Sequence, residues 1–194
     1  MNNKIIIITG APGTGKSKIS KSIIEKLDGF EIFSYDDIKE MFWDKYGFDG
    51  LLEKELVNKK SLAYFYKELE TKMSKGISLI IEYPFCEKHK KELSKLVDSY
   101  SYKAVTVLLY GDTHTLFLRC QVRDGDDRHP GHLASQYNKE KNVLKYFVKT
   151  ENDFKNEIES KNYDINIGKT YKINILDIDK KKLVQEIVNY FEDN

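Results

Sequence analysis

Short apolar runs alternate with amphipathic segments along this chain of 194 residues. The runs are rich in β-branched residues and unbroken by polar positions, which is typical of strands buried on both faces. They cover Lys4–Thr9, Glu31–Ser34, Ile77–Tyr83, Ala104–Tyr110 and Tyr171–Leu176. Between them, apolar residues recur every three or four positions. This spacing predicts helices over Ser17–Leu27, Asp36–Tyr46, Leu51–Lys75, Glu87–Tyr100, Thr113–Val122 and Lys180–Phe191.

Two further segments complete the pattern. Gly47-Phe48-Asp49-Gly50 breaks one helix from the next, and helical spacing continues from about Ala134 to Lys161. Strands that alternate with helices predict an α/β fold, a three-layer sandwich with a mostly parallel five-stranded sheet. Because no repeat or linker divides the chain, we expect a single domain over residues 1–194.

Composition narrows the class of protein. Hydrophobic residues make up 40% and charged residues 32%, which excludes a disordered chain and a membrane protein. The first residues lack the pattern of a signal peptide. Cys86 and Cys120 give no disulfide framework, so we expect a cytoplasmic protein with no membrane partner.

Charge adds a sharper observation. The net charge of +1 argues against general binding of nucleic acid, which stays a disfavoured partner. Basic residues number 32, and all but three are lysine. The three arginines fall within ten residues: Arg119, Arg123 and Arg128. Arginine offers a planar, always-charged fork for phosphate or carboxylate, so this cluster is a candidate site.

One motif carries specific chemistry. The stretch Gly10-Ala11-Pro12-Gly13-Thr14-Gly15-Lys16-Ser17 fits G-x-x-x-x-G-K-[ST] between a predicted strand and a predicted helix. Glycines let successive N–H groups point at phosphate oxygens, Lys16 reaches the β- and γ-phosphates, and Ser17 ligates Mg²⁺. The helix adds its positive end, so residues Gly10 through Lys18 are expected to bind nucleotide.

Other classes of phosphate-loop protein fit less well. A GTPase carries an N/T-K-x-D motif, and the best match, Asn58-Lys59-Lys60-Ser61, lacks the aspartate. An AAA+ or ABC motor needs more chain and more motifs. The compact kinase type remains, with ATP as donor and Mg²⁺ as metal.

A pair of carboxylates follows the second predicted strand. Asp36 and Asp37 are placed at the carboxyl edge of the sheet, where ligands bind in such folds. Phosphoryl transfer needs a group that orients the attacking hydroxyl and accepts its proton. Asp36 is the better candidate and Asp37 the alternative, while a helix cap is the competing interpretation.

A second acid ends the third predicted strand. Glu82 follows a wholly apolar run, in the pattern of a carboxylate that holds Mg²⁺ or its water. An ordinary strand-end acid facing solvent is the equal alternative. Tyr83, Pro84 and Phe85 form either a wall for the acceptor or a hydrophobic support.

The arginine cluster resembles a lid in its composition. Arg119 and Arg123 are four residues apart and share a helix face, and Arg128 lies beyond Gly125. We expect a lid at about residues 123–132 that brings these side chains to the transferring phosphate. The alternative is that the arginines simply pair with Asp124, Asp126 and Asp127.

Histidines and aromatic residues leave alternatives open. His129 and His132 are expected to cap helices or bond substrate rather than bind metal, and His89 and His114 to lie on helix surfaces. An aromatic stretch serves either an acceptor pocket or helix packing: Phe42, Trp43, Tyr46, Phe48, Tyr64, Phe65 and Tyr66.

Over residues 4–135 these motifs together resemble the small P-loop kinase group, which includes polynucleotide 5′-kinase domains, zeta-toxin-like and chloramphenicol-phosphotransferase-like enzymes. Tyr35-Asp36-Asp37-Ile38-Lys39 is similar to the polynucleotide-kinase stretch whose first aspartate is the general base, which implies this role for Asp36. Lys39 departs from the arginine of that stretch. Residues 119–132 resemble the lid of predicted kinases in the group.

We therefore expect a phosphotransferase that moves the γ-phosphoryl of Mg-ATP to a hydroxyl of a small-molecule or nucleoside-like acceptor. Lys16, Asp36, Arg119, Arg123 and Arg128 are the candidate catalytic residues, and Ser17 and Glu82 the candidate metal ligands. A polynucleotide 5′-hydroxyl kinase and a non-catalytic nucleotide-sensing module are the alternatives.

Overall fold

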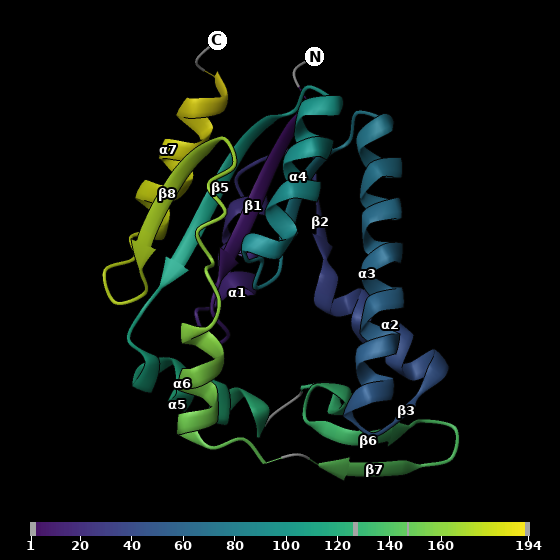
Figure 1. Ribbon diagram of the computed structural model, residues 1–194. Coiled ribbons are helices and arrows are strands. Elements are labelled where there is room, and N and C mark those ends of the chain that lie inside the picture. The colour runs from purple at the N-terminus through teal and green to yellow at the C-terminus, as the bar shows by residue number, and fades with distance from the viewer. Residues whose placement is uncertain (1–2, 126–127, 147, 193–194) are drawn as a thin grey trace.

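Five parallel strands form the main sheet of the protein (Figure 1). The computed structural model describes residues 3–125, 128–146 and 148–192. Across the sheet the order is β2 (Phe30–Ser34), β4 (Ser78–Glu82), β1 (Lys4–Gly10), β5 (Lys103–Tyr110) and β8 (Lys169–Asn174). Every pair in this order is parallel, so the carboxyl ends of all five strands meet at one edge.

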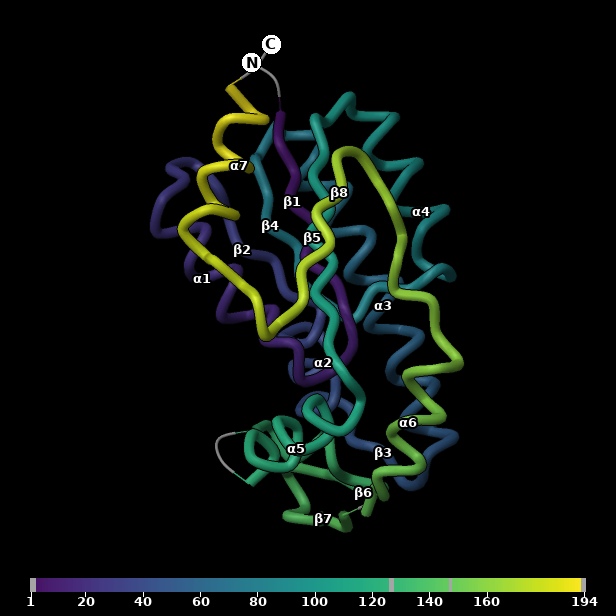
Figure 2. Tube along the Cα trace, turned by 90° about the vertical axis from the view of Figure 1, so that its left-hand side faces the viewer, coloured from purple at the N-terminus to yellow at the C-terminus, as the bar shows by residue number. Residues whose placement is uncertain are grey.

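Helices cover both faces of this sheet (Figure 2). On one face lie α1 (Lys16–Ile24) and α7 (Lys180–Glu192), and on the other α3 (Leu51–Ser74) and α4 (Glu87–Ser99). Successive residues of β1 point to opposite faces, yet all are inaccessible to solvent: Ile5, Ile6, Ile7 and Ile8. The continuous apolar run that predicted β1 therefore reflects burial on both faces, and the three-layer α/β prediction is confirmed.

The remaining helices lie at the carboxyl edge of the sheet (Figure 1). They are α2 (Tyr35–Tyr46), α5 (Thr113–Asp124) and α6 (Glu151–Glu159), with a short 3₁₀ turn, η1 (Pro130–His132). The fifth strand was predicted to begin at Tyr171, but β8 begins two residues earlier, at Lys169. The first helix was predicted to end at Leu27, but α1 ends at Ile24.

A second, three-stranded antiparallel sheet was missed by the sequence patterns. It pairs β3 (Phe48–Asp49) with β6 (Ala134–Asn138), and β6 with β7 (Val143–Tyr146). The prediction of helix from Ala134 was therefore wrong for the hairpin and correct only near α6. A register shift between Ala134 and Gln136 breaks the two-residue alternation that would have indicated a strand.

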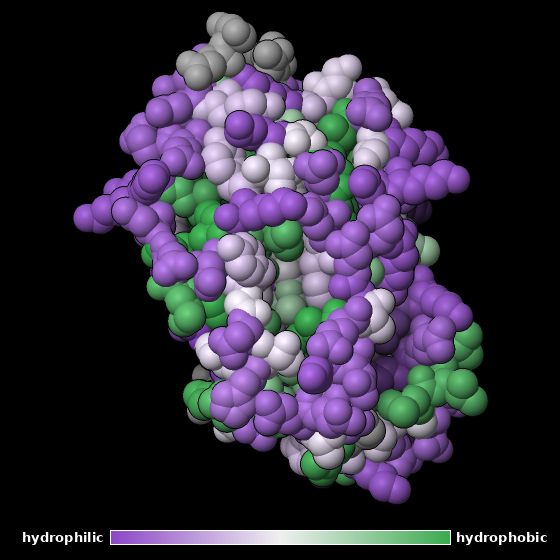
Figure 3. Space-filling view, turned by 60° about the vertical axis from the view of Figure 1, so that its left-hand side comes forward, coloured by the Kyte–Doolittle hydropathy of each residue, from purple (hydrophilic) through white to green (hydrophobic). Residues whose placement is uncertain are grey.

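The surface is largely polar in the view of Figure 3, where apolar residues form separate patches. Within residues 3–125, 128–146 and 148–192, no helix is long and apolar enough to cross a membrane.

Phe65 tests the core between α3 and the sheet. Its ring is wholly buried and stacks on Phe33 with ring centroids 5.0 Å apart. We expect Phe65→Ala to lower the free energy of unfolding by about 3–5 kcal/mol, because it leaves a cavity. The control is Leu52→Ala on the same helix, since Leu52 is 81% exposed and its loss should change stability by about 0.5 kcal/mol or less. Urea denaturation measures both, and equal losses would contradict the assigned packing.

Candidate active site

The predicted phosphate loop lies where β1 ends, between β4 and β5. Gly10 has φ of 133°, and a Cβ there would lie 2.1 Å from the carbonyl oxygen of Leu109. Gly13 has φ of 85°, and its Cβ would lie 2.5 Å from the carbonyl oxygen of Leu116. Only glycine fits both positions, so the loop depends on these residues for its path into α1.

Lys16 folds back over this loop. Its Nζ donates hydrogen bonds to the carbonyl oxygens of Gly10 and Ala11, each at 3.0 Å. Burial lowers the pKa of Lys16 to about 8, although Asp36 and Glu82 oppose the shift. A phosphate in the loop would supply negative charge that stabilises the charged form of Lys16 and raises its pKa again.

Glu82 meets Ser17 directly. The Ser17 hydroxyl donates to Glu82 Oε1 at 2.8 Å, and Ser20 donates to the other carboxylate oxygen. Glu82 is only 8% exposed, so the alternative of a strand-end acid facing solvent is wrong. The structure thus joins the two residues predicted to lie at the metal.

These oxygens fit Mg²⁺. Magnesium prefers oxygen ligands and usually takes one or two protein groups, completing its shell with waters and substrate phosphates. In the described part of the chain, no group of three or more His, Cys, Asp or Glu could hold a metal by itself. The pair Ser17 and Glu82 suits a metal that arrives with a nucleotide.

Asp36 lies in the first turn of α2 but does not cap it. The cap is Ser34, whose hydroxyl oxygen accepts from the Asp37 N–H at 3.5 Å. Burial acts to raise the pKa of Asp36, but the positive charges of Lys39, Arg128 and Lys16 outweigh it and hold that pKa below its usual value. Asp37 is more exposed than Asp36. The partial burial of its carboxyl, together with the nearby charge of Glu40, raises its pKa.

Lys39 is fixed beside Asp36. The two side chains form an ion pair of 3.3 Å. The Lys39 ammonium also lies over three aromatic rings, with centroids 4.9 Å away for Trp43, 5.3 Å for Tyr83 and 5.8 Å for Tyr35. Lys39 is therefore held against the Asp36 carboxylate by contacts on several sides.

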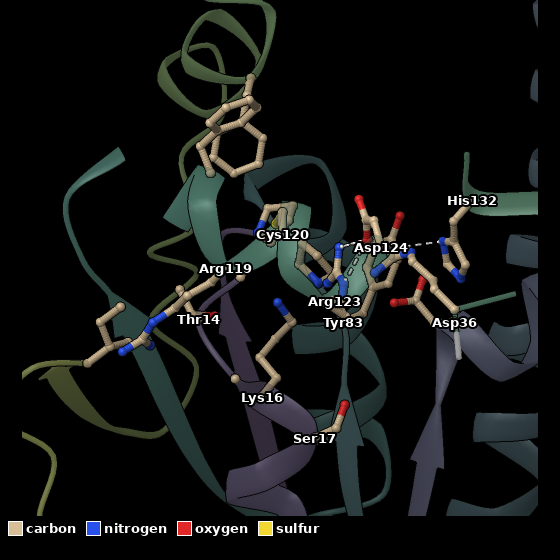
Figure 4. Close-up of a pocket in the computed structure, with 18 of the residues that line it drawn as sticks. Thr14, Lys16, Ser17, Asp36, Tyr83, Arg119, Cys120, Arg123, Asp124 and His132 are labelled. Carbon is tan, nitrogen blue, oxygen red and sulfur yellow. Dashed lines mark hydrogen bonds and ion pairs between the residues drawn. The ribbon is translucent and has the colours of Figure 1, made fainter. Parts of the chain in front are cut away.

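Two of the three arginines meet at one carboxylate. Arg123 donates to Asp124 Oδ1 through Nε at 3.0 Å and a terminal nitrogen at 2.9 Å, and Arg128 Nε lies 3.5 Å from the same oxygen. Arg119 is exposed and extends away from Arg123 and Asp36 (Figure 4). The structure thus brings Arg123 and Arg128 together and leaves Arg119 apart.

The segment after α5 is docked on α2. Arg128 donates to His132 Nδ1 at 2.9 Å, so the Nε2–H of His132 donates to Glu40 at 2.8 Å. His129 caps η1 by accepting from the Gly131 N–H and donates to Asp44 at 3.0 Å. The predicted lid spans residues 123–132, of which Asp126 and Asp127 lie outside the described residues.

Two cavities that share several lining residues surround these groups. The larger, of 1380 Å³, is lined by the phosphate loop and by all three arginines. The smaller, of 440 Å³, is shared by Ser17, Glu82, Asp36, Arg123 and Arg128.

Tyr83 and Pro84 line the larger cavity, but Phe85 is wholly buried and forms no wall. Most of the aromatic stretch packs in the core, Trp43 and Phe65 among its largest buried side chains, which agrees with the interpretation as helix packing.

His114 is exposed as expected, with 65% of its side chain accessible. The expectation for His89 was wrong, because it is 3% exposed. Sequence reasoning also missed Tyr163 and Lys161, which line the cavity from beyond α6.

A family model described as an AAA domain matches residues 6–145, more than half of the chain. The chain belongs to this AAA-domain family. The match spans the phosphate loop, Asp36, Glu82 and the arginines. A search among curated protein sequences finds no significant match. The expectation that the protein is no motor rested on chain length and motifs, and it stays a prediction.

Solved structures share this fold, and some of them are described as kinases. A "putative kinase" from Chloroflexus aurantiacus has a TM-score of 0.78 at 20% identity, with 98% of this chain and 99% of that one covered. The tunicamycin resistance protein of Deinococcus radiodurans has a TM-score of 0.59 at 16% identity, covering 97% and 95%. The APS kinase of Mycobacterium tuberculosis has 0.56 at 12%, covering 99% of each chain. This member of the AAA-domain family therefore has the fold of the small P-loop kinases.

His132 predicts how stability depends on pH. Burial lowers its pKa to about 4 against the opposing effect of Glu40, so the unfolded chain takes up a proton below pH 6.5 that the folded protein refuses. The free energy of unfolding should therefore fall between pH 6.5 and 4, by roughly 1.4 kcal/mol per pH unit for one proton. His132→Asn should remove this part of the slope.

The control for this measurement is His114→Asn. Glu151 raises the pKa of His114, so its contribution lies at higher pH and the acid slope should match that of the unaltered protein. Urea denaturation at several pH values measures all three proteins. An unchanged slope in His132→Asn would contradict the neutral, docked imidazole.

Proposed function

We propose that this protein is a kinase that transfers the γ-phosphoryl of ATP to a hydroxyl of a small-molecule or nucleoside-like acceptor. The family match and the kinase fold support a phosphotransferase in general terms. The observation that carries the finer proposal is the smaller cavity, where a candidate metal pair, a candidate base and two arginines face one another. A nucleotide-sensing module would have no use for the candidate base or the two arginines.

The donor end is assigned to residues Gly10 through Lys18. Backbone N–H groups of the loop and the start of α1 would hold the phosphates, with Lys16 exchanging its two carbonyl partners for phosphate oxygens. Ser17 and Glu82 would hold Mg²⁺. When bound, this metal would supply positive charge that neutralises the phosphates during transfer.

Asp36 is assigned to the acceptor. Its lowered pKa keeps it ionised at neutral pH, so it accepts a hydrogen bond from the attacking hydroxyl and then its proton. Phosphoryl transfer proceeds through a loose transition state in most analyses, so orientation matters more than strong basicity. The pair with Lys39 fixes the carboxylate for this purpose.

Arg123 and Arg128 are assigned to the transferring phosphoryl group. Both already lie in the smaller cavity, paired with Asp124. Phosphate oxygens would replace the Asp124 carboxylate and receive the same fork-like donors. Arg119 lines the larger cavity away from this point, and we assign it to the donor nucleotide.

The test of the function is a search for the product. Nucleosides, sugars, aminoglycosides and 5′-hydroxyl oligonucleotides are incubated with γ-labelled ATP. We expect label in one class of acceptor with matching ADP, and loss of both in Lys16→Ala, since that ammonium neutralises the phosphates. Label confined to oligonucleotides would favour a polynucleotide kinase. ADP release that survives in Lys16→Ala would contradict the assigned site.

Asp36 and Asp37 are distinguished by matched variants. We expect Asp36→Asn to lower kcat by about a hundredfold or more, the usual contribution of a positioned base, while KM for ATP stays nearly constant. Asp37→Asn alters the neighbouring carboxylate in the same helical turn and should retain kcat. Steady-state kinetics of both variants measures the difference, and the reverse result would assign the base to Asp37.

A further inference from the structure

The larger cavity continues past Tyr83 into a region that the assigned donor and catalytic groups leave unused. It is lined there by the start of α4, by α6 and by the segment that follows α6. These elements lie on the same side of the sheet in both views of the backbone (Figures 1 and 2). Tyr83 lies between the candidate base and the unused region: Lys39, which pairs with Asp36, lies 5.3 Å from the centroid of its ring, and the His89 ring lies 5.8 Å away.

A buried hydroxyl without a partner lines this region. Tyr163 is 8% exposed, and its phenol oxygen makes no hydrogen bond. Burial raises the pKa of Tyr163, with Glu157 adding to the shift, so the group stays protonated and offers a donor. Buried polar groups are nearly always satisfied, and an orphan beside a cavity points to a ligand that supplies the acceptor.

A histidine presents a second donor. Cys86 N–H donates to His89 Nδ1 at 3.0 Å, so the neutral ring carries its proton on Nε2. Burial, followed by the charge of Lys88, lowers the pKa of His89 to about 4, which keeps the ring neutral. Among the described residues, Nε2 has no hydrogen-bond partner.

The charges of the region are unbalanced. Lys149 and Lys161 both pair with Glu157, which leaves one positive charge among the three groups. Lys88 also lines the cavity and forms no close ion pair in the described part of the chain, although its charge also acts on Glu55. Hydrogen-bond donors and lysine side chains thus line the region, and Glu157 neutralises only part of their positive charge. Such an arrangement recognises anions.

We propose that this region binds an anionic group of the acceptor, a carboxylate or a phosphate, while the acceptor hydroxyl lies at Asp36. The assignment to the acceptor rests on the proposed function, whereas the binding of an anion does not. The acceptor class is therefore a hydroxylated acid or a phosphorylated sugar or nucleoside, and Tyr163, His89 and Lys88 determine specificity.

Binding is tested without turnover. The labelled protein is titrated with ribose 5-phosphate against ribose, and with gluconate against glucose, while NMR follows the amides and the His89 ring. We expect the NMR chemical shifts of Lys88, His89 and Tyr163 to change with ribose 5-phosphate or with gluconate, and not with the matching neutral sugar. The arm that responds distinguishes phosphate from carboxylate.

Matched variants locate the site. Tyr163→Phe removes only the hydroxyl and should weaken binding roughly tenfold, as expected for a hydrogen bond to a charged group. Lys155→Met is the control, because Lys155 lies on α6 with 56% of its side chain exposed and does not line the cavity. Shifts confined to the phosphate-loop amides, equal shifts with the neutral sugars, or no shifts at millimolar concentration would each overturn the proposal.

Turnover separates the two proposals. With an acceptor in hand, Tyr163→Phe should raise its KM roughly tenfold and leave kcat and the KM for ATP unchanged. If neutral acceptors are phosphorylated as efficiently as anionic ones, the anion site is overturned and the kinase stands. If anions bind at Tyr163 and no ATP is consumed, the proposed kinase fails and the anion site stands.

Discussion

The hydrogen bond from Ser17 to Glu82 links the parts on which the candidate site depends. It joins the first turn of α1 to the end of β4, two segments that are 65 residues apart in the chain. The bond is set by the sheet, because Ile8 pairs with Glu82 and the phosphate loop begins two residues later. A one-residue shift in the β1–β4 register would separate the hydroxyl from the carboxylate and turn Glu82 to the opposite face of the sheet.

A second constraint positions the groups opposite the loop. The segment after α5 is fixed on α2 by His132 with Glu40 and by His129 with Asp44. Gly131 allows this contact, since a Cβ there would lie 2.4 Å from the Trp43 ring. Arg128 is thereby held near Asp36, so α2 supplies both the candidate base and the support for one arginine. The expected lid is, in this structure, a docked segment with its arginines already at the cavity.

Local patterns predicted the elements that burial controls and missed those that pairing controls. The apolar run of β1 and the motif around Lys16 are short-range signals, and the sheet and phosphate loop followed from them. The β6–β7 hairpin depends on a bulge and on pairing with β3, more than 80 residues earlier, and neither leaves a local period. His89 was assigned to the surface because its bond to the Cys86 backbone depends on the precise start of α4.

The candidate site was predicted in its chemistry more than in its geometry. Ser17 was named from the phosphate-loop motif and Asp36 and Glu82 from their positions at strand ends, and the parallel topology brings these positions together. The arginines were named because they are few and close together in the sequence. This pattern does not show where each side chain points, so Arg119 was grouped with Arg123 and Arg128 although it extends away from them.

Charge explains how such a site stays folded without its ligands. Buried charges are costly unless they are paired. Asp124 pairs with Arg123 and Arg128, Glu157 pairs with Lys149 and Lys161, and backbone carbonyls hold Lys16. Each of these internal acceptors offsets positive charge that lines the cavities. The net charge of +1 therefore says little about the candidate site, where cations gather around a few internal acceptors.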